Sequence, residues 1–264
     1  MIHLPEDRAI CEELLRSARD RGDRAKPIPA LIVEVGERFL GAPYEAATLE
    51  QEGPEQLVVN LRSFDCVTFV ENAIVLASLI RAGKRNFADY LVALKRIRYR
   101  RGRLDGYASR LHYFTDWLYD GARKGIVRDV TAAIGGIPFP KRFHALTDRR
   151  AANPALADRA VFHRLRCAEW TCSRRPLFFI PEASLPAHQS RIADGDIVAI
   201  ATDDEGIDVC HAGFAVRRGE RVRLLHASSA AGRVLLSEAT LAEYLAERES
   251  RRGIVVGRVV TNGD

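Results

Sequence analysis

The chain has 264 residues, of which 47% are hydrophobic and 28% charged, and its formal net charge is +5. This length allows one large domain or two small ones, and folding can bury roughly 70–75% of the extended chain's surface, so a core forms without disulfides. The 5 cysteines are an odd number, which argues against a complete disulfide framework.

The N-terminal segment 1–7 lacks the basic start and apolar stretch of a secretory signal. The longest uncharged apolar run, 73–80, is too short to span a bilayer, so we expect no stable membrane insertion. We therefore expect a cytoplasmic protein, or a periplasmic or exported one if a leader was removed. The arginine-rich runs 96–103 and 164–175 are explained by solvated helix faces, and no nucleic-acid recognition motif accompanies them.

Several segments in the first half carry apolar residues at spacings of three and four, which predicts amphipathic helices. Their apolar positions are Ile10, Leu14, Leu15 and Ala18; Leu31, Ile32, Val35 and Phe39; Val70, Ala73, Ile74, Ala77 and Ile80; Phe87, Tyr90, Leu91, Leu94 and Ile97; and Leu111, Phe114 and Leu118. Residues 126–153 are rich in Gly, Pro and polar residues, so we expect loops there. A helix is predicted over 155–173, with Cys167 and Cys172 as packing residues.

The second half has a different periodicity. Short β-rich runs cover 196–200, 209–216, 222–227 and 253–260, separated by glycine and charged turns, and a short helix is predicted over 238–247. Helices first and strands later predict an α+β fold with an antiparallel sheet. We expect a single domain over 1–264, with a helical part at 1–125, a loop and helix insertion at 126–190, and a β-rich part at 191–264.

The most informative position is Cys66, at the predicted start of a buried helix. A thiol there sits among unpaired backbone N–H groups at the positive end of the helix dipole, and both favour the nucleophilic thiolate. The alternative is a small residue that fills the core, since free cysteines are often buried.

A nucleophilic cysteine needs a base, and the base needs a group that orients it. His211 and His226 fall on predicted strands that a turn at 217–220 would make neighbours. Adjacent strands lie about 4.8 Å apart, so the two rings could form a hydrogen bond. The expected order is Cys66 as nucleophile, His211 as base and His226 as orienting group. Small residues beside both histidines would let the helix end approach the sheet: Ala212, Gly213, Ala227 and Ser228. The alternative is that each is a satisfied core histidine.

These residues resemble a known family. The segments 41–44 (GAPY) and 64–66 (FDC), the strand histidine and a second polar residue one strand later resemble the NlpC-type cell-wall cysteine peptidases, which have a papain-like core. The closer resemblance is to the N-acetylmuramoyl-L-alanine amidase-like branch of that superfamily. It is carried, over about residues 30–260, by the blocks 65–71, 97–100, 107–113, 195–197, 211–213 and 226–228.

The resemblance implies a papain-like α+β fold in which the nucleophile helix packs on a C-terminal antiparallel sheet. It implies cleavage of the amide between N-acetylmuramic acid and L-alanine in peptidoglycan fragments (muropeptides) through an acyl-enzyme, without metal or cofactor. The alternatives are a γ-D-glutamyl stem-peptide endopeptidase of the same fold, a non-catalytic cell-wall-binding domain, and a Cys/His zinc protein. Recycling of wall fragments in the cytoplasm would fit the expected location.

The resemblance also implies roles for further residues. The hydroxyl of Tyr44, with the backbone N–H of Cys66, would stabilise the oxyanion, although Tyr44 could also be a packing residue. Asp65 would cap the helix or contact substrate. The remaining expected substrate-binding residues are Arg110, His112, Tyr113 and Ser228. The alternative for the first three is a polar seam between helices, and the alternative for Ser228 is a hydrogen bond that satisfies the backbone.

Overall fold

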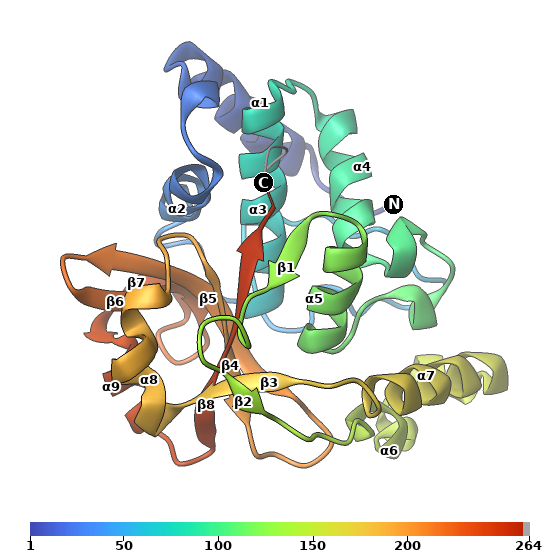
Figure 1. The fold of residues 1–264 in the computed structure, drawn as a ribbon. Coiled ribbons are helices and arrows are strands. Elements are labelled where there is room, and N and C mark those ends of the chain that lie inside the picture. The colour runs from blue at the N-terminus through green and yellow to red at the C-terminus, as the bar shows by residue number, and fades with distance from the viewer. Residues whose placement is uncertain (261–264) are drawn as a thin grey trace.

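The structure, a computed structural model, describes residues 1–260 of the chain. Helices of the first half gather on one side of a sheet formed mostly by the second half, as Figure 1 shows. The expected α+β organisation, with a helical first half and an antiparallel C-terminal sheet, is confirmed. No helix within the described range is long and apolar enough to cross a membrane.

The larger helices lie close to their predicted positions. They are α1 (Pro5–Asp20), α2 (Ile28–Arg38), α3 (Cys66–Ala82), α4 (Phe87–Arg98), α5 (Phe114–Arg123) and α7 (Arg159–Cys172). The shorter helices are α6 (Ala145–Asp148), α8 (Leu185–His188) and α9 (Leu241–Ala246). In α7, Cys172 is buried as expected, whereas Cys167 is exposed, because it lies on the outer face of that helix.

The strands are β1 (Val127–Asp129), β2 (Ile137–Pro138), β3 (Phe178–Pro181), β4 (Ile197–Thr202), β5 (Val209–Arg218), β6 (Arg221–Ser228), β7 (Arg233–Thr240) and β8 (Arg251–Val259). They form an eight-stranded sheet of order β2-β3-β8-β4-β5-β6-β7, with β1 paired to β8, and the strand pairs are antiparallel.

Two expectations about these elements were wrong. The helix expected over 238–247 begins only at Leu241, and residues 233–240 before it form strand β7, which the sequence pattern does not indicate. Thr240 is the last residue of β7 and also caps the helix with its side chain. Because no loop separates the two elements, the sequence pattern does not show where the strand ends and the helix begins. The segment 126–153, expected to be loops, contains β1, β2 and α6, which are too short to show a periodicity.

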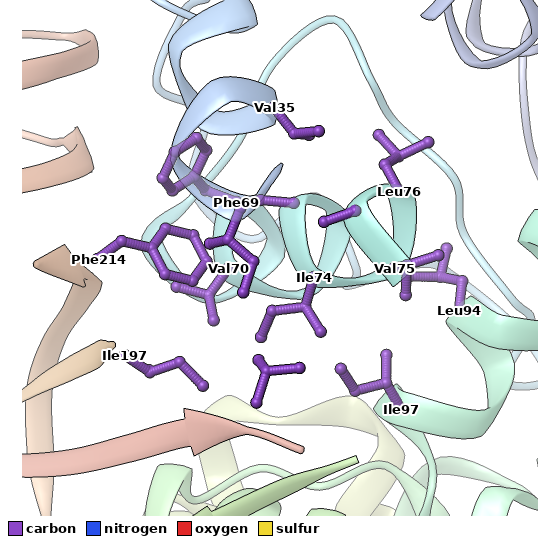
Figure 2. Packing of buried hydrophobic residues seen from close by; sticks show 14 of the residues in the cluster. Val35, Phe69, Val70, Ile74, Val75, Leu76, Leu94, Ile97, Ile197 and Phe214 are labelled. Atoms are coloured by element: carbon purple, nitrogen blue, oxygen red, sulfur yellow. The ribbon is translucent and has the colours of Figure 1, made fainter. Parts of the chain in front are cut away.

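Helix α3 is buried on nearly every side, because it lies between the other helices and the sheet (Figure 2). Phe69 of α3 packs edge-to-face against Phe214 of β5, with ring centroids 5.8 Å apart. Ala212 and Leu225 belong to the same core cluster, so this sheet face carries α3. The opposite face packs against α9 in a second cluster that includes Ile200, Leu224, Leu241 and Leu245.

Candidate active site

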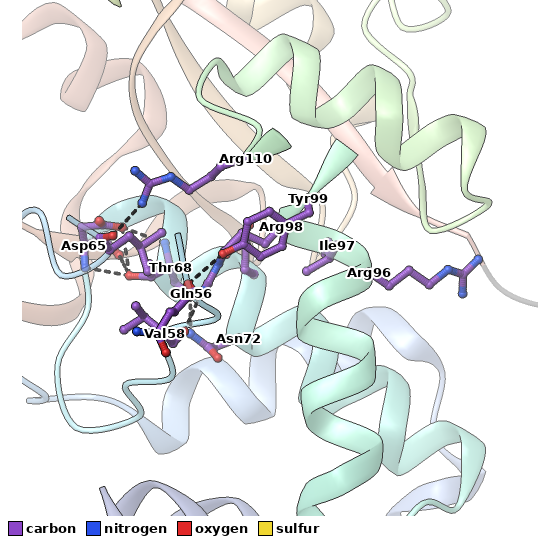
Figure 3. Close-up of polar contacts among 12 residues, drawn as sticks. Gln56, Val58, Asp65, Thr68, Asn72, Arg96, Ile97, Arg98, Tyr99 and Arg110 are labelled. Atoms are coloured by element: carbon purple, nitrogen blue, oxygen red, sulfur yellow. Dashed lines mark hydrogen bonds and ion pairs between the residues drawn. The ribbon is translucent and has the colours of Figure 1, made fainter. Parts of the chain in front are cut away.

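Cys66 is the first residue of α3, and a reciprocal cap fixes the helix start there. The Asp65 carboxylate accepts a hydrogen bond from the Thr68 backbone N–H at 2.7 Å, and the Asp65 backbone N–H donates to Thr68 Oγ1 at 2.9 Å. Figure 3 shows these contacts between Asp65 and Thr68. The expected capping role of Asp65 is thus present, and it leaves the N–H groups of Cys66 and Val67 free for other acceptors.

Cys66 as a residue is partly exposed, but its thiol is enclosed at the junction of helix and sheet. Burial raises the pKa of this thiol to about 12, and the Asp65 charge raises it further, while hydrogen bonds from the backbone N–H groups of Ala212, Cys66 and Val67 oppose them. The N–H groups at the helix start favour the thiolate as expected, but desolvation outweighs them, so the thiol of the resting protein is neutral. The Ala212 contact also places the sulfur beside the residue that follows His211.

The two strand histidines are brought together as predicted. Nε2 of His211 lies 2.6 Å from Nδ1 of His226, and the rings are nearly perpendicular. The turn at 218–221 joins their strands, and the β5–β6 ladder runs only as far as Phe214 paired with Leu225. His211 lies beyond that last pair, so the hydrogen bond between the rings links the two strands where the ladder has ended.

Both imidazoles lie on the sheet face covered by α9, whereas Cys66 begins the helix that packs on the opposite face, so the structure brings the histidines to each other rather than into contact with the thiol. His211 is paired across the sheet with Ile200 of β4, and His226 is two residues from Leu224, so both share the face of the second core cluster. Ala212 and Ala227 point to the α3 face, where their small side chains let the helix approach as expected. Gly213 acts differently, because the space beside it is filled by the His226 Cβ atom rather than by the helix.

Both histidines are neutral near pH 7. Burial lowers the pKa of His211 to about 3, and the neighbouring His226 and Arg251 lower it further. Burial also lowers the pKa of His226 to about 4, again with a contribution from Arg251. A neutral pair shares one proton in the hydrogen bond between the rings. If Nε2 of His211 donates that proton, Nδ1 of the same ring keeps its lone pair and can act as a base.

Tyr44 lies beside the cysteine. It forms a backbone β-bridge with Phe64, and burial raises the pKa of its phenol, as do the Cys66 thiol when it is ionised and the Asp65 carboxylate. Ser228 instead satisfies the backbone, since its Oγ accepts a hydrogen bond from the Ala231 N–H at 3.1 Å. Of the two uses expected for Ser228, the structure shows this one.

The cluster expected at 110–113 already has partners within the protein. Arg110 is buried, donates to Glu50 Oε1 at 2.6 Å and lies over the Tyr107 ring. His112 Nε2 donates to the Tyr107 carbonyl at 3.0 Å, and burial lowers its pKa to about 3. The Tyr113 hydroxyl donates to Glu169 of α7 at 2.7 Å. This arrangement corresponds to the expected alternative, a polar seam, and substrate binding by these residues stays a prediction.

A buried polar network supports the N-terminal half of α3 (Figure 3). Arg98 of α4 forms an ion pair with Glu71 at 2.7 Å and donates to the Val58 carbonyl at 2.5 Å. Separately from this ion pair, Asn72 donates to the Thr68 carbonyl at 2.8 Å, at the capped end of the helix. Sequence reasoning placed both ion-pair residues in characteristic blocks but assigned them no role.

Sequence reasoning also missed Tyr244 of α9, whose ring lies against both histidines. The sequence carries little signal for this contact, because the aromatic residue sits in a short helix remote from the histidine strands. Among the described residues, no group of three or more His, Cys, Asp or Glu side chains is arranged to hold a metal ion.

Comparison with known proteins gives consistent results. Residues 34–254 match the AmiA-like family, described as N-acetylmuramoyl-L-alanine amidase-like. The crystal structure of an N-acetylmuramoyl-L-alanine amidase from Bacteroides uniformis ATCC 8492 is similar, with a TM-score of 0.84 and 33% identity over 89% of this chain and 99% of that chain. No curated protein matches the chain.

Two further solved structures are similar. A putative xylanase from Bacteroides fragilis has a TM-score of 0.80 and 34% identity, over 85% of this chain and 99% of that chain. A protein from Legionella pneumophila str. Philadelphia 1 has a TM-score of 0.72 and 20% identity, over 97% of this chain and 95% of that one, and supports the fold alone.

Proposed function

The chain belongs to the AmiA-like, N-acetylmuramoyl-L-alanine amidase-like family, and from this premise we propose that it is a cysteine amidase with Cys66, His211 and His226 as its catalytic residues. The proposed substrate is a muropeptide, cut at the amide between N-acetylmuramic acid and L-alanine. The observation that carries the proposal is that the backbone N–H that donates to the Cys66 thiol belongs to Ala212, the residue directly after His211, whose ring forms a hydrogen bond with His226.

The first step would form the acyl-enzyme. Because the imidazoles lie on the α9 face of the sheet and Cys66 begins the helix on the other face, we propose that one water molecule passes the thiol proton to Nδ1 of His211 as the Cys66 sulfur attacks the lactyl carbonyl carbon and a carbon–sulfur bond forms. In the resting protein the thiol and the imidazole are both neutral, because burial disfavours a thiolate. The thiol proton therefore leaves as the sulfur attacks rather than beforehand. Nδ1 of His226 accepts a hydrogen bond from the Nε2–H of His211 and thereby stabilises the imidazolium that forms.

The negative charge on the carbonyl oxygen would be met by hydrogen-bond donors close to the sulfur. The N–H groups of Cys66 and Val67 have no helical partner, and the Tyr44 phenol lies next to the sulfur. His211 then gives its proton to the nitrogen of L-alanine, the carbon–nitrogen bond breaks, and the peptide amine leaves.

In the second step water would attack the thioester. His211 removes a proton from the water, the oxygen bonds to the acyl carbon, and the carbon–sulfur bond breaks as the thiol regains its proton. The products are a free muramic acid carboxylate and a peptide with an L-alanine N-terminus. We place this chemistry on a papain-like, NlpC-type core and propose that it serves cytoplasmic recycling of wall fragments, which cell fractionation tests.

The test is incubation of the protein with an anhydromuramyl peptide, with Cys66→Ala as the control variant and mass spectrometry of the products. We expect anhydromuramic acid and the intact stem peptide from the wild type and neither from the variant. Release of a muramyl-L-alanyl-D-glutamate fragment would assign the stem-peptide endopeptidase activity instead. Binding without cleavage would assign a cell-wall-binding domain. Xylan serves as a negative control, since one structural neighbour is named a putative xylanase.

A further inference from the structure

We propose that Arg251 and Tyr244 form a positioning stack that fixes the orientation of His211 and His226 and holds a buried cation against the ring that contacts both. Neither residue is expected to touch the substrate, and both would act through the histidines. The catalytic consequence rests on the proposed function, whereas the effect on the histidines themselves does not.

The geometry of the stack starts with the Tyr244 ring. Its centroid lies 5.4 Å from that of His226 at an interplanar angle of 74°, and 6.2 Å from that of His211 at 36°. These separations are typical of aromatic contacts, which favour particular relative orientations. A single side chain from α9 therefore contacts both imidazoles, and it constrains their planes where the β5–β6 ladder has ended.

Arg251, the first residue of β8, holds Tyr244 from a second element. Its Cζ atom lies 3.8 Å from the Tyr244 ring centroid, within the range of a cation–π contact. Its Nη1 donates to the Tyr244 backbone carbonyl and also to Glu247 Oε2 at 3.1 Å. Arg251 is only 8% exposed, so its charge is little screened by solvent. The contacts bind α9 to β8 and hold a cation near the histidines.

Several other charges surround the pair and must be weighed against this cation. Arg248, which follows α9, lowers the pKa of His211. Glu247, at the end of α9, raises the pKa of Tyr244, whereas Arg251 lowers it. On β5 the neighbouring group is the Cys210 thiol, and Asp204, in the turn before β5, raises the pKa of that thiol. At the start of α3, on the other sheet face, the titratable groups are the neutral Cys66 thiol and Asp65, and neither shifts the pKa of the pair.

Among these groups Arg251 is the one that lowers the pKa of both histidines. A fixed positive charge disfavours the imidazolium form, so the pair stays available as a base at a lower pH than burial alone would allow. The same contacts that orient the rings therefore also set the pH at which they become protonated.

The test compares Arg251→Met with Arg251→Lys in the pH profile of kcat/KM. Removing the cation raises the pKa of the pair, so the acidic limb of Arg251→Met should move up by roughly half to one pH unit. Arg251→Lys keeps the charge and should keep the limb within a few tenths of a unit of wild type. Arg252→Met is the matched control, because Arg252 is the next residue on β8 and is exposed.

Glu247→Gln tests the same idea in the opposite direction. Glu247 is about half exposed, so the variant should fold even if Arg251→Met does not. Loss of this counter-charge should move the acidic limb down. An unchanged limb in both Arg251→Met and Glu247→Gln, with activity lowered equally at every pH, would mean that the stack is only structural.

A readout without turnover separates this inference from the proposed function. Histidine-labelled Cys66→Ala protein can be titrated by NMR, which follows the ring nitrogens of His211 and His226 directly. Adding Arg251→Met should move both midpoints up by a similar half to one unit. If the midpoints shift but the protein with Cys66 intact shows no amidase activity, the stack is upheld and the proposed function is overturned. If the midpoints do not move although the protein with Cys66 intact is an active amidase, the stack is overturned.

Discussion

A Cβ atom placed on Gly213 would lie 2.8 Å from the Cβ of His226. The two residues face each other across β5 and β6, one position beyond the end of the ladder. Glycine is therefore required at 213 for space rather than for backbone conformation, and the space it leaves is used by a proposed catalytic residue.

Gly213→Ala should accordingly displace His226 and break its hydrogen bond with His211. We expect loss of more than about tenfold in kcat, with a stability cost of about 1–3 kcal/mol from overpacking. Gly219→Ala is the control, because a Cβ on this turn glycine would have no atom within 4 Å and only the positive φ would be strained. The control should lose about 1 kcal/mol in urea unfolding and keep its kcat.

The base and its orienting group should differ in importance. His211→Ala removes the group that accepts the thiol proton, so we expect a loss of roughly a thousandfold or more in kcat. His226→Ala leaves that base in place but frees its ring, and the loss should be roughly tenfold to hundredfold. Single-turnover kinetics on an anhydromuramyl peptide measures both. Equal losses would show that the two rings act as one unit rather than in these separate roles.

Asp65 should influence the reactivity of Cys66 as well as the helix cap. Asp65→Asn keeps a side-chain acceptor for the Thr68 N–H but removes the charge that raises the thiol pKa, so alkylation of Cys66 by iodoacetamide near neutral pH should become faster. Asp65→Ala should in addition cost about 1 kcal/mol of stability through the lost cap.

The alkylation experiment requires Cys167→Ser and Cys210→Ser in every protein compared, because these two thiols are exposed. Peptide mapping then reports the label on Cys66 alone. A slower reaction in Asp65→Asn than in the parent would contradict the charge argument.

Protonation of the histidine pair should oppose folding. Folding lowers the pKa of His211 from 6.5 to about 3 and that of His226 from 6.5 to about 4. At a pH between the folded and unfolded pKa values, the unfolded chain therefore binds protons more readily than the folded one. The stability from this source is present above pH 6.5 and is lost as the pH falls toward 4. Urea unfolding at a series of pH values should show that loss, and a flatter profile in a variant with both histidines changed to Gln.

The buried ion pair between Glu71 and Arg98 should be costly to break from one side. Glu71→Gln leaves the Arg98 guanidinium buried without its counter-charge, so we expect a loss of about 3–5 kcal/mol in the free energy of unfolding. The double variant Glu71→Leu with Arg98→Met should lose less than either single change. Arg8→Ala, which breaks an exposed pair with Glu12, is the control and should cost under about 1 kcal/mol.

Local sequence determined which helix start carries the proposed nucleophile and which strands carry the two histidines. The start of α3 at Cys66 follows from the Asp65 cap and the apolar periodicity that comes after it. The pairing of His211 with His226 follows from the turn at 218–221, since a hairpin makes the register between its strands a local matter. Both features depend on residues close in sequence, which is why pattern reasoning reached them.

Tertiary structure decided how these groups behave. Burial by distant segments reverses the expected shift of the Cys66 thiol pKa, and desolvation of this kind leaves no mark in the residues next to it. Glu50 and Glu169 engage Arg110 and Tyr113 from remote parts of the chain, and Tyr244 reaches the histidines from α9. Such contacts arise only when the elements pack, because chain folding, and not sequence proximity, brings their side chains together.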